Sequence, residues 1–317
     1  MSLPLSPAET PTIHFIGVST KQSAIMKVFP EWAAELNIPG AAISGIDLPL
    51  NAPPEWYREV VNFIRNDRES RGALVTTHKI DLFLAAQEQF DELDWFATAM
   101  HEVNSISKRN SKLVGQAKDP ISAGRTLCAM FPENFWASEE SQVFCMGGGG
   151  AGVAITWFLL RGEHQLGRPT RIIVSDISAA RLGHLQRLVN SSRLETRLIR
   201  SPEENDAIMQ VLRPRSLVIN ATGLGKDRPG SPITDAPEFP HESIVWELNY
   251  RGSLDFLEQA RKQAESRKLQ IHDGWDYFIH GWTCVISDVF ALDIPTDNAT
   301  FRRLSGVAVQ AANRTPN

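Results

Sequence analysis

The sequence predicts an α/β fold built as two domains. The chain has 317 residues, which exceeds the usual size of one hydrophobic core and is short for three. Apolar, β-branched segments alternate with segments of helical periodicity, the order that produces parallel sheets covered by helices. A run of four glycines lies between one strand-like segment and the next helix-like segment, near the middle of the chain.

The first series of elements lies between residues 12 and 100. β-Branched and apolar runs predict strands at 12–19, 41–49 and 71–78. Amphipathic spacing predicts helices at 23–38, 53–67, 79–90 and 93–100. Strands that alternate with helices pair in parallel, so this part predicts an open α/β unit.

A second series follows the segment 110–131. Strands are predicted at 141–146, 171–176, 196–200, 216–222, 243–250 and 269–274, and helices at 150–165, 177–192, 204–212 and 252–266. Helices at 275–290 and 300–312 close the chain and are expected to return to the first domain. The predicted domains are therefore 1–120 together with 275–317, and a second α/β domain of the doubly wound type at 121–274.

Charge and cysteine content exclude several classes of protein. The net charge is -5, and Lys and Arg are spread along the chain, so no nucleic-acid partner is expected. The three cysteines, Cys128, Cys145 and Cys284, form no C-x-x-C pair and predict buried thiols in a reducing compartment. His78 and His280 lack partners at ligand spacing, so no metal site is expected.

The N-terminal stretch MSLPLSPAETPT has no basic region followed by an apolar one, and no segment reaches the ~18 apolar residues of a membrane helix. We therefore expect a cytoplasmic protein with no membrane partner.

The turn GGGGAG fits the pattern G-x-G-x-x-G at Gly147, Gly149 and Gly152, with Gly150 and Ala151 between the last two. The first glycine permits a tight turn, the second lets the backbone approach a pyrophosphate, and the third allows close helix packing. The helix that follows directs its N-terminus at the anion. The alternative is a turn that only reverses the chain.

Asp176 ends the strand after the glycine turn. Its carboxylate is expected to accept hydrogen bonds from adenosine ribose hydroxyls and to repel a 2′-phosphate. The alternative role is an N-cap of the helix that follows. Asn220, Ala221 and Thr222 end a later strand at the carboxyl edge, where dinucleotides lie in open α/β sheets.

Six short segments follow one another in the order LVTTHK, EVNS, LVGQAKD, GGGGAG, INATGLG and DGWDYFIHG. In that order they resemble motifs of the shikimate dehydrogenase family, namely N-V-T-x-P-x-K, G-A-V-N-T, G-x-N-T-D, G-A-G-G-A-G, N-A-T-P-x-G and G-L-x-M-L-x-x-Q. The match spans about residues 12 to 290. The resemblance implies a substrate domain, a Rossmann domain that binds a nicotinamide dinucleotide, and an active site in the cleft between them.

By the same resemblance, Lys79 matches the family's catalytic lysine and Asp119 its catalytic aspartate. When hydride leaves an alcohol carbon, the hydroxyl must lose its proton, which a lysine can exchange while an aspartate orients the hydroxyl. The matches expected to bind substrate are Ser23, Thr76, Asn104 and Tyr250. Taken singly, Lys79 also fits a surface lysine at a helix start, Asp119 an N-cap before Pro120, and Tyr250 a core tyrosine.

Departures from the family pattern point to a changed substrate. Ile25 replaces the second serine of a Ser-x-Ser pair, Leu74 replaces an asparagine, and Gly281 replaces the late glutamine. A site that loses hydrogen-bond partners discriminates against its old ligand, so shikimate is not expected to be the best substrate. Lys118 replaces the threonine beside Asp119, and we expect its side chain to point to solvent because adjacent side chains diverge.

The cofactor is predicted to be NAD rather than NADP. NADP-using members of the family carry Asn-Arg-Thr where this chain has Asp176, Ile177 and Ser178. An acid replaces the asparagine, and the phosphate-binding arginine is absent.

Together these features predict an NAD-dependent dehydrogenase that acts on the ring CH–OH of a shikimate-, quinate- or cyclitol-like substrate. One alternative is a genuine shikimate 5-dehydrogenase, a 3-dehydroshikimate reductase that uses NADP. Another is a non-catalytic nucleotide-sensing homologue, although retention of Lys79 and Asp119 argues against it. The family resemblance allows a monomer or a homodimer.

Overall fold

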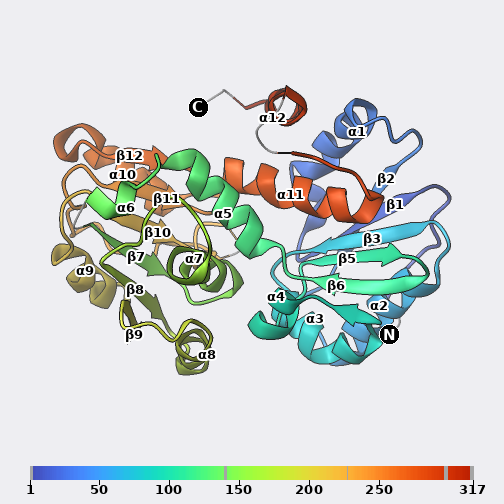
Figure 1. Ribbon diagram of the computed structural model, residues 1–317, viewed down its shortest axis with the longest axis horizontal. Coiled ribbons are helices and arrows are strands. Elements are labelled where there is room, and N and C mark those ends of the chain that lie inside the picture. Colours follow the sequence, from blue (N-terminus) through green and yellow to red (C-terminus); the bar gives the residue numbers. More distant parts are fainter. Residues whose placement is uncertain (1–2, 139–140, 227, 296–298, 315–317) are drawn as a thin grey trace. The chain divides into compact units, whose positions relative to one another are not determined.

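The computed structural model describes residues 3–138, 141–226, 228–295 and 299–314. It divides into two compact units, of which unit 1 is Met1–Lys118 with Ile279–Asn317 and unit 2 is Asp119–Phe278. Each unit is a sheet flanked by helices (Figure 1), which confirms the predicted α/β fold class.

Unit 1 is built on a sheet of strand order β2-β1-β3-β5-β6-β4. Its strands are β1 (Thr12–Gly17), β2 (Ala42–Asp47), β3 (Ser70–Val75), β4 (Glu92–Leu93), β5 (Ser105–Arg109) and β6 (Lys112–Gln116). Its helices are α1 (Ile25–Glu35), α2 (Pro54–Asn66), α3 (Lys79–Ala86), α4 (Trp95–Met100) and α12 (Ala299–Ala311), with 3-10 turns at η1 (Thr20–Gln22) and η2 (Gln87–Gln89). Strands β1, β2 and β3 pair in parallel as predicted.

The second half of this sheet was not predicted and contains antiparallel strands. Strand β5 runs antiparallel to both β3 and β6, and the sequence reading assigned neither β5 nor β6. A two-residue loop joins them, with Asn110 at φ 50 and Ser111 at φ 64. Two positive φ values in succession make a type I′ turn, whose twist matches that of the paired strands. The hairpin brings Asn104 beside Val75, whose N–H donates to the Asn104 carbonyl at 2.9 Å.

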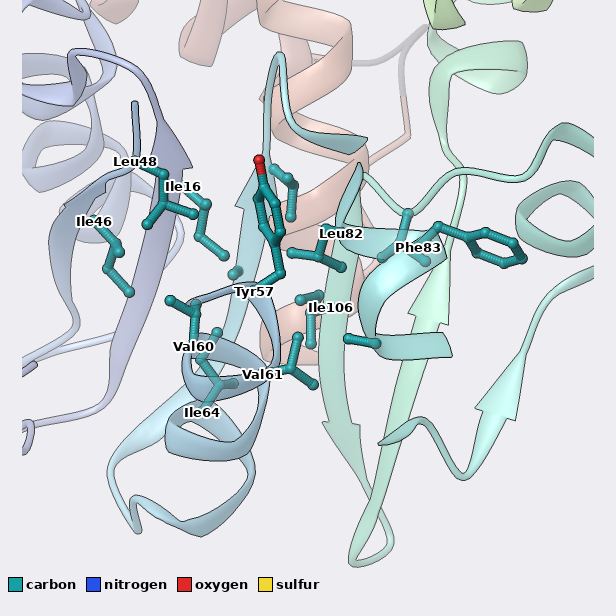
Figure 2. Packing of buried hydrophobic residues seen from close by; sticks show 14 of the residues in the cluster. Ile16, Ile46, Leu48, Tyr57, Val60, Val61, Ile64, Leu82, Phe83 and Ile106 are labelled. Atoms are coloured by element: carbon teal, nitrogen blue, oxygen red, sulfur yellow. The ribbon is translucent and has the colours of Figure 1, made fainter. Parts of the chain in front are cut away.

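The core of unit 1 lies between the sheet and α2 and α3. Figure 2 shows Tyr57, Val60 and Ile64 of α2 packed with Ile16 and Ile106 of the sheet. Burying each such side chain stabilises the unit by roughly 1.5–3 kcal/mol.

The last part of α11 (Trp275–Phe290) covers the other sheet face of unit 1. The Trp282 ring lies 5.1 Å from that of Phe15, and a Cβ at Gly72 would lie 3.0 Å from Val289. Helix α12 packs on α1, where Trp32 Nε1 donates to the Leu304 carbonyl at 2.8 Å. The predicted return of C-terminal helices to the first domain is confirmed.

Unit 2 is a parallel sheet of strand order β12-β11-β10-β7-β8-β9. Its strands are β7 (Gln142–Met146), β8 (Arg171–Asp176), β9 (Leu194–Leu198), β10 (Leu217–Asn220), β11 (Ile244–Glu247) and β12 (Gln270–His272). Its helices are α5 (Asp119–Met130), α6 (Phe135–Ser138), α7 (Gly150–Arg161), α8 (Ala179–Val189), α9 (Pro202–Gln210) and α10 (Asp255–Arg267). From β7 the chain adds strands first on one side, as β8 and β9, and then on the other side, as β10, β11 and β12. Ligands of such sheets bind where the strand order reverses, at the carboxyl ends of the strands.

One face of the unit 2 sheet is covered by α9 and α10. Phe144, Val218 and Val245 of the sheet share a buried cluster with Met209 of α9 and Phe256 of α10. The alternation of strand residues between the two faces directs these side chains to one side.

Among the residues that the structure describes, no helix is both long and apolar enough to cross a bilayer. The same residues include no group of three or more His, Cys, Asp or Glu side chains that could hold a metal ion.

Candidate functional site

The glycine turn of unit 2 contains two positions that only glycine fits. Gly147 has φ 109, and a Cβ there would lie 2.6 Å from the Ala221 carbonyl oxygen. A Cβ at Gly152 would lie 1.9 Å from the Gly147 carbonyl oxygen. Real Cβ atoms do not approach oxygen so closely, so both glycines are required by the packing of the turn against β10 and against its own helix.

The middle of the turn is open. Gly149 is the N-cap of α7, and no described atom lies within 4 Å of the position its Cβ would take. Gly149, Gly150 and Ala151 are all partly exposed. The first N–H groups of α7 have no partner within the helix, so this open edge has the geometry of an anion cradle.

Cys145 lies beneath the turn. Its thiol is buried and donates to the Gly147 carbonyl at 3.8 Å. Burial, and secondarily the charge of Asp176, raises the pKa of the Cys145 thiol to about 12. The thiol is therefore unreactive in the folded protein, in agreement with its prediction as a buried cysteine.

Asp176 ends β8 with 6% of its surface exposed and is bonded on both oxygens. Oδ2 accepts the Gly148 N–H and Oδ1 accepts the Ser178 N–H, each at 2.7 Å. The N-cap of α8 is Ser178, which accepts from the Arg181 N–H at 3.4 Å, so the N-cap interpretation of Asp176 is wrong. The carboxylate ties the glycine turn to the end of β8, and each oxygen retains acceptor capacity.

The surroundings of Asp176 combine one cation with apolar surface. Arg181 Nη1 lies 3.8 Å from Asp176 Oδ2 and is half exposed. Ile177 is 70% exposed, and Leu198, the β9 partner of Asp176 in the register, is 51% exposed.

Asn220 ends β10 beside the glycine turn. Its Nδ2 donates to Glu247 Oε2 at 2.6 Å. Its Oδ1 accepts from the Thr222 N–H at 3.1 Å and from the Thr222 hydroxyl at 2.7 Å. The next residue, Ala221, donates its N–H to the Met146 carbonyl at 2.7 Å. The strand end, the turn after it and the neighbouring β7 are thus held together.

Glu247 at the end of β11 was missed by the sequence analysis. Its side chain is fully buried, and Oε1 accepts both the N–H and the Nδ2 of Asn249, each at 2.7 Å. Burial raises the pKa of Glu247 to about 7, although its hydrogen bonds and the charge of Lys226 favour the ionised form. The available signal was an acid that ends the apolar run IVWE at a carboxyl edge.

Tyr250 follows β11 and is half buried. Its ring centroid lies 4.6 Å from that of Phe278 and 5.5 Å from that of Trp275. The aromatic cluster restricts the ring while part of it remains exposed.

In unit 1, Lys79 is the first residue of α3 and is half buried. The turn before it is strained, because Thr77 has φ 61 and the His78 N–H donates to the Thr76 carbonyl at 2.5 Å. This is a γ-turn with a positive central φ, which a β-branched residue rarely adopts. Such strain persists where the surrounding structure holds the backbone firmly.

His78 supplies part of that hold. It is buried, and its Nε2 lies 3.0 Å from the Leu48 carbonyl oxygen, which can only accept, so Nε2 carries the proton. Nδ1 lies 3.0 Å from the Tyr57 hydroxyl oxygen. Burial, with the charge of Asp81 adding to it, raises the pKa of Tyr57 to about 12, so this hydroxyl stays protonated. The two contacts hold His78 at the start of α3.

The other predicted substrate residues of unit 1 lie at the same carboxyl edge of β1 and β3. The Thr76 N–H donates to the Ile16 carbonyl at 2.9 Å, and the Ser23 N–H donates to the Thr20 carbonyl at 2.9 Å after β1. The Val103 N–H donates to the Lys79 carbonyl at 3.1 Å. Asn104, the next residue, therefore lies near the start of α3. Unit 1 brings Ser23, Thr76, Lys79 and Asn104 to one edge.

Lys118 does not point to solvent, and that expectation is wrong. Its side chain is 12% exposed, and Nζ pairs with Asp288 Oδ2 of α11 at 2.6 Å. Arg109 Nη2 pairs with Asp288 Oδ1 at 2.6 Å, and the Gln116 amide bridges Lys118 and Asp288. The Lys118 N–H also donates to Asn104 Oδ1 at 2.7 Å, which fixes the orientation of that amide.

Asp119 is the first residue of α5 and of unit 2, with 6% of its surface exposed. Its carbonyl accepts from the Ser122 hydroxyl at 3.2 Å.

The three departures from the family pattern occupy different environments. Ile25 is fully buried at the start of α1, and Leu74 is half buried in β3. Gly281 lies in α11, and no described atom lies within 4 Å of the position its Cβ would take.

The curated proteins that match this chain in sequence carry the same name. No family model matches the chain. Shikimate dehydrogenase (NADP(+)) of Streptococcus gordonii is 30% identical over 177 residues, which cover 55% of this chain and 58% of that protein. The protein of the same name from Streptococcus pneumoniae is 24% identical over 201 residues, which cover 59% of this chain and 64% of that protein. The chain thus spans less than two thirds of the length of the curated relatives it matches.

Solved structures match over nearly the whole chain. The shikimate dehydrogenase from Aquifex aeolicus superposes with a TM-score of 0.70 at 18% identity, over 97% of this chain and 99% of that one. The chain is similar to shikimate dehydrogenases in sequence over part of its length and in fold over nearly all of it. The resemblance predicted from the six motifs is thereby confirmed.

Other structures share the fold of this shikimate dehydrogenase-like chain under different names. Quinate dehydrogenase from Corynebacterium glutamicum in complex with NAD matches with a TM-score of 0.68 at 16% identity, over 95% of this chain and 99% of that one. The 5-ketofructose reductase of a Gluconobacter strain matches with a TM-score of 0.66 at 16% identity, over 96% of this chain and 98% of that one. The fold therefore accommodates several substrates.

Proposed function

We propose that the chain is a dehydrogenase that transfers hydride between a nicotinamide dinucleotide and a ring hydroxyl or ketone of a shikimate-, quinate- or cyclitol-like substrate. The observation that carries the proposal is the glycine turn at the switch point of the parallel sheet. Gly147 and Gly152 are sterically required, while Gly149 faces open space. A turn that only packs against its neighbours, or that only reverses the chain, does not require open space at Gly149.

The residues present fit a dinucleotide. Gly149, Gly150 and Ala151 offer the open N-terminus of α7 to a pyrophosphate. Asp176 and Ile177 would contact the adenosine, and the segment Asn220, Ala221 and Thr222 would hold the nicotinamide end. When bound, the nicotinamide ring supplies the hydride donor or acceptor.

We assign proton transfer to Lys79 and orientation of the substrate hydroxyl to Asp119. Lys79 is half buried at the start of a helix whose preceding turn is strained and held by His78. Such a fixed amine can exchange the hydroxyl proton as the carbon is oxidised. Ser23, Thr76, Asn104 and Tyr250 are the proposed substrate contacts. The altered residues Ile25, Leu74 and Gly281 support a substrate other than shikimate.

The catalytic assignment is tested with Lys79→Ala in a screen of shikimate, quinate, cyclitols and hydroxy acids that follows the absorbance of reduced cofactor. We expect turnover of the best substrate to fall by about 100-fold or more, the usual effect of losing a general acid–base group. Lys112→Ala is the matched control, since that lysine is 56% exposed on β6. Near wild-type turnover by Lys79→Ala would refute the assignment.

The same screen separates the alternatives. Shikimate turned over faster than every other compound would support a genuine shikimate 5-dehydrogenase, as the names of the relatives favour. Dinucleotide binding without turnover of any compound would favour a nucleotide-sensing protein.

We propose NAD as the preferred cofactor, although the curated relatives are named for NADP. The Asp176 carboxylate would repel a 2′-phosphate, and Arg181 lies close enough to be partly neutralised by that carboxylate. Calorimetric titration should show NAD binding at least tenfold tighter than NADP. Tighter or equal NADP binding would overturn the proposal.

A two-residue cycle tests the cause of that preference. Asp176→Asn should relax the preference, because the amide removes the repulsion and leaves Arg181 free to meet the phosphate. Adding Arg181→Ala to that variant should weaken NADP binding and leave NAD binding nearly unchanged. Equal effects on both cofactors would show that Asp176 acts only by holding the turn.

A further inference from the structure

The carboxylate of Glu247 lies at the centre of a buried hydrogen-bond network in unit 2. It accepts hydrogen bonds from Asn220 Nδ2 at 2.6 Å, from the Asn249 N–H at 2.7 Å and from Asn249 Nδ2 at 2.7 Å. All three are donors, so the ionised carboxylate matches every one of them. Asn220 belongs to the end of β10 and Asn249 follows β11, so one side chain connects the two strand ends.

The network has a fixed direction. Because a carboxylate only accepts, Asn220 must turn its NH₂ toward Glu247 and its Oδ1 away. Oδ1 then accepts both the N–H and the hydroxyl proton of Thr222. The Thr222 oxygen in turn accepts the Leu224 N–H at 3.1 Å. The charge on Glu247 therefore decides which way each group in the turn points.

A second path closes the network. Asn249 Nδ2 donates to the Leu224 carbonyl at 3.2 Å as well as to Glu247. The turn after β10 and the segment after β11 are thus bonded to each other at Leu224. Each is also bonded to Glu247, the turn through Asn220 and the segment through Asn249. Tyr250 is the next residue along the second segment.

Burying this carboxylate is costly, which indicates that its acceptor character is used. Burial raises the pKa of Glu247 to about 7, and the charged group that favours its ionised form from the facing turn is Lys226. A glutamine of nearly equal size would avoid the cost of burying a charge. The NH₂ group of that glutamine would, however, place a further donor among the three donors that now point at the Glu247 carboxylate.

We propose that Glu247 is a positioning residue that orients Thr222 for the dinucleotide and sets the segment bearing Tyr250 in register with it. The ligand part of this inference rests on the proposed function. Glu247 itself is fully buried. Its effect is transmitted through Asn220 and Asn249.

The geometry predicts that the hydrogen bonds of the network form again when the negative charge is moved from residue 247 to residue 220. In Glu247→Gln, the new oxygen can keep both Asn249 donors only if its NH₂ faces the NH₂ of Asn220. Adding Asn220→Asp replaces that second donor with an acceptor, and the other aspartate oxygen still accepts from Thr222. The double variant therefore restores the contact between residues 247 and 220 and keeps the bonds to Asn249 and Thr222, and it loses only the 3.5 Å bond from Asn220 Nδ2 to the Leu224 carbonyl. Each single variant mismatches the contact between residues 247 and 220.

The experiment compares wild type, both single variants and the double variant in two measurements at pH 8. Hydrogen exchange in the ligand-free protein reports the order of residues 221–226 and 248–252. Titration with NAD and with NADP reports ligand positioning. Glu258→Gln on α10 is the control, because that side chain is 53% exposed.

In Glu247→Gln we expect exchange in both segments to become about tenfold faster and the better dinucleotide to bind about tenfold more weakly, the loss of roughly one hydrogen bond. The double variant should return both values to within about threefold of wild type. Unchanged exchange in Glu247→Gln, or no recovery in the double variant, would overturn the proposal. If Glu247→Gln does not fold, the double variant must fold and bind, and its failure would count against the proposal.

The two proposals fail in distinguishable ways. A wild-type protein that binds neither NAD nor NADP contradicts the proposed function, while the exchange cycle still decides whether Glu247 orders the two segments. Normal dinucleotide binding by every variant, with altered exchange, contradicts the ligand-positioning role alone.

Discussion

Gly149 and Gly152 belong to one turn, and their surroundings assign them different roles. A Cβ at Gly152 would overlap the Gly147 carbonyl oxygen at 1.9 Å, whereas none of the described atoms lies within 4 Å of a Cβ at Gly149. Gly152 is therefore required for folding, and Gly149 leaves room for a group from outside the chain.

The substitutions Gly149→Ala and Gly152→Ala should therefore separate binding from stability. Gly152→Ala should lower the free energy of unfolding by about 2 kcal/mol or more, because the backbone must move to admit the methyl group. Gly149→Ala should change stability by less than about 1 kcal/mol and weaken dinucleotide binding at least tenfold. Urea unfolding and calorimetry provide the two measurements, and a stable Gly149→Ala that binds normally would contradict the cradle.

At this scale the sequence identified residue types better than side-chain directions. The three spaced glycines and Asp176 were recognisable because each lies at a strand end with a fixed offset. The direction of Lys118 was not, because its partner Asp288 lies on α11, 170 residues later in the chain. Glu247 was overlooked because its network depends on Asn220 of another strand.

Among the elements, the segment after β6 and α11 are joined by an ion pair of low exposure. Lys118 and Asp288 are 12% and 14% exposed, and Arg109 bonds the second oxygen of Asp288. Lys112 and Glu92 make a pair of similar length between β6 and β4, but they are 56% and 52% exposed. These two pairs differ mainly in burial.

Asp288→Asn should therefore destabilise unit 1 far more than Glu92→Gln. Removing one partner of a pair with little exposure leaves a charge without compensation, here that of Lys118, at a cost of about 2 kcal/mol. Breaking the exposed pair should cost less than about 0.5 kcal/mol. Native-state hydrogen exchange of β5 and β6 measures both, and equal effects would show that burial does not control this contact.

Most elements were predictable because their periodicity is strong, and the hairpin shows where that signal ends. The strand β5, SISKR, has polar residues at both sheet faces, and the turn is Asn-Ser rather than the usual Asn-Gly. Ser107 is nevertheless fully buried. Burial of such a strand is decided by its neighbours in the sheet and not by its own composition.

For the whole molecule, each unit contains a buried titratable group that its proposed chemistry does not use directly. In unit 1, His14 Nε2 lies 2.6 Å from Ser70 Oγ, which donates its own proton to Asp67 at 2.6 Å. Burial lowers the pKa of His14 to about 4, with Asp67 opposing and Lys108 adding to the shift. In unit 2, burial raises the pKa of Glu247 to about 7.

The contributions of His14 and Glu247 to the stabilities of the two units should depend on pH in opposite directions. Folded unit 1 binds fewer protons at His14 than the unfolded chain does, so its stability is full above pH 6.5 and falls toward pH 4. Folded unit 2 binds more protons at Glu247, so that contribution is present below pH 4.5 and is lost as pH rises to about 7. Each effect amounts to about 3 kcal/mol.

Urea unfolding followed by pulsed hydrogen exchange resolves the two units and measures both trends. His14→Gln should flatten the trend in unit 1 alone, and Glu247→Gln should flatten it in unit 2 alone. Parallel trends in the two units of the wild type would contradict the assignment to these groups.

The burial of Cys145 under the glycine turn gives this protein an internal chemical reporter. The thiol bonds to the Gly147 carbonyl and, with a pKa raised to about 12, is not alkylated while the turn is closed. The rate at which an alkylating reagent labels Cys145 therefore measures how often the turn opens. A ligand seated on the far side of the same turn would slow that labelling, which makes occupancy measurable without knowledge of the substrate.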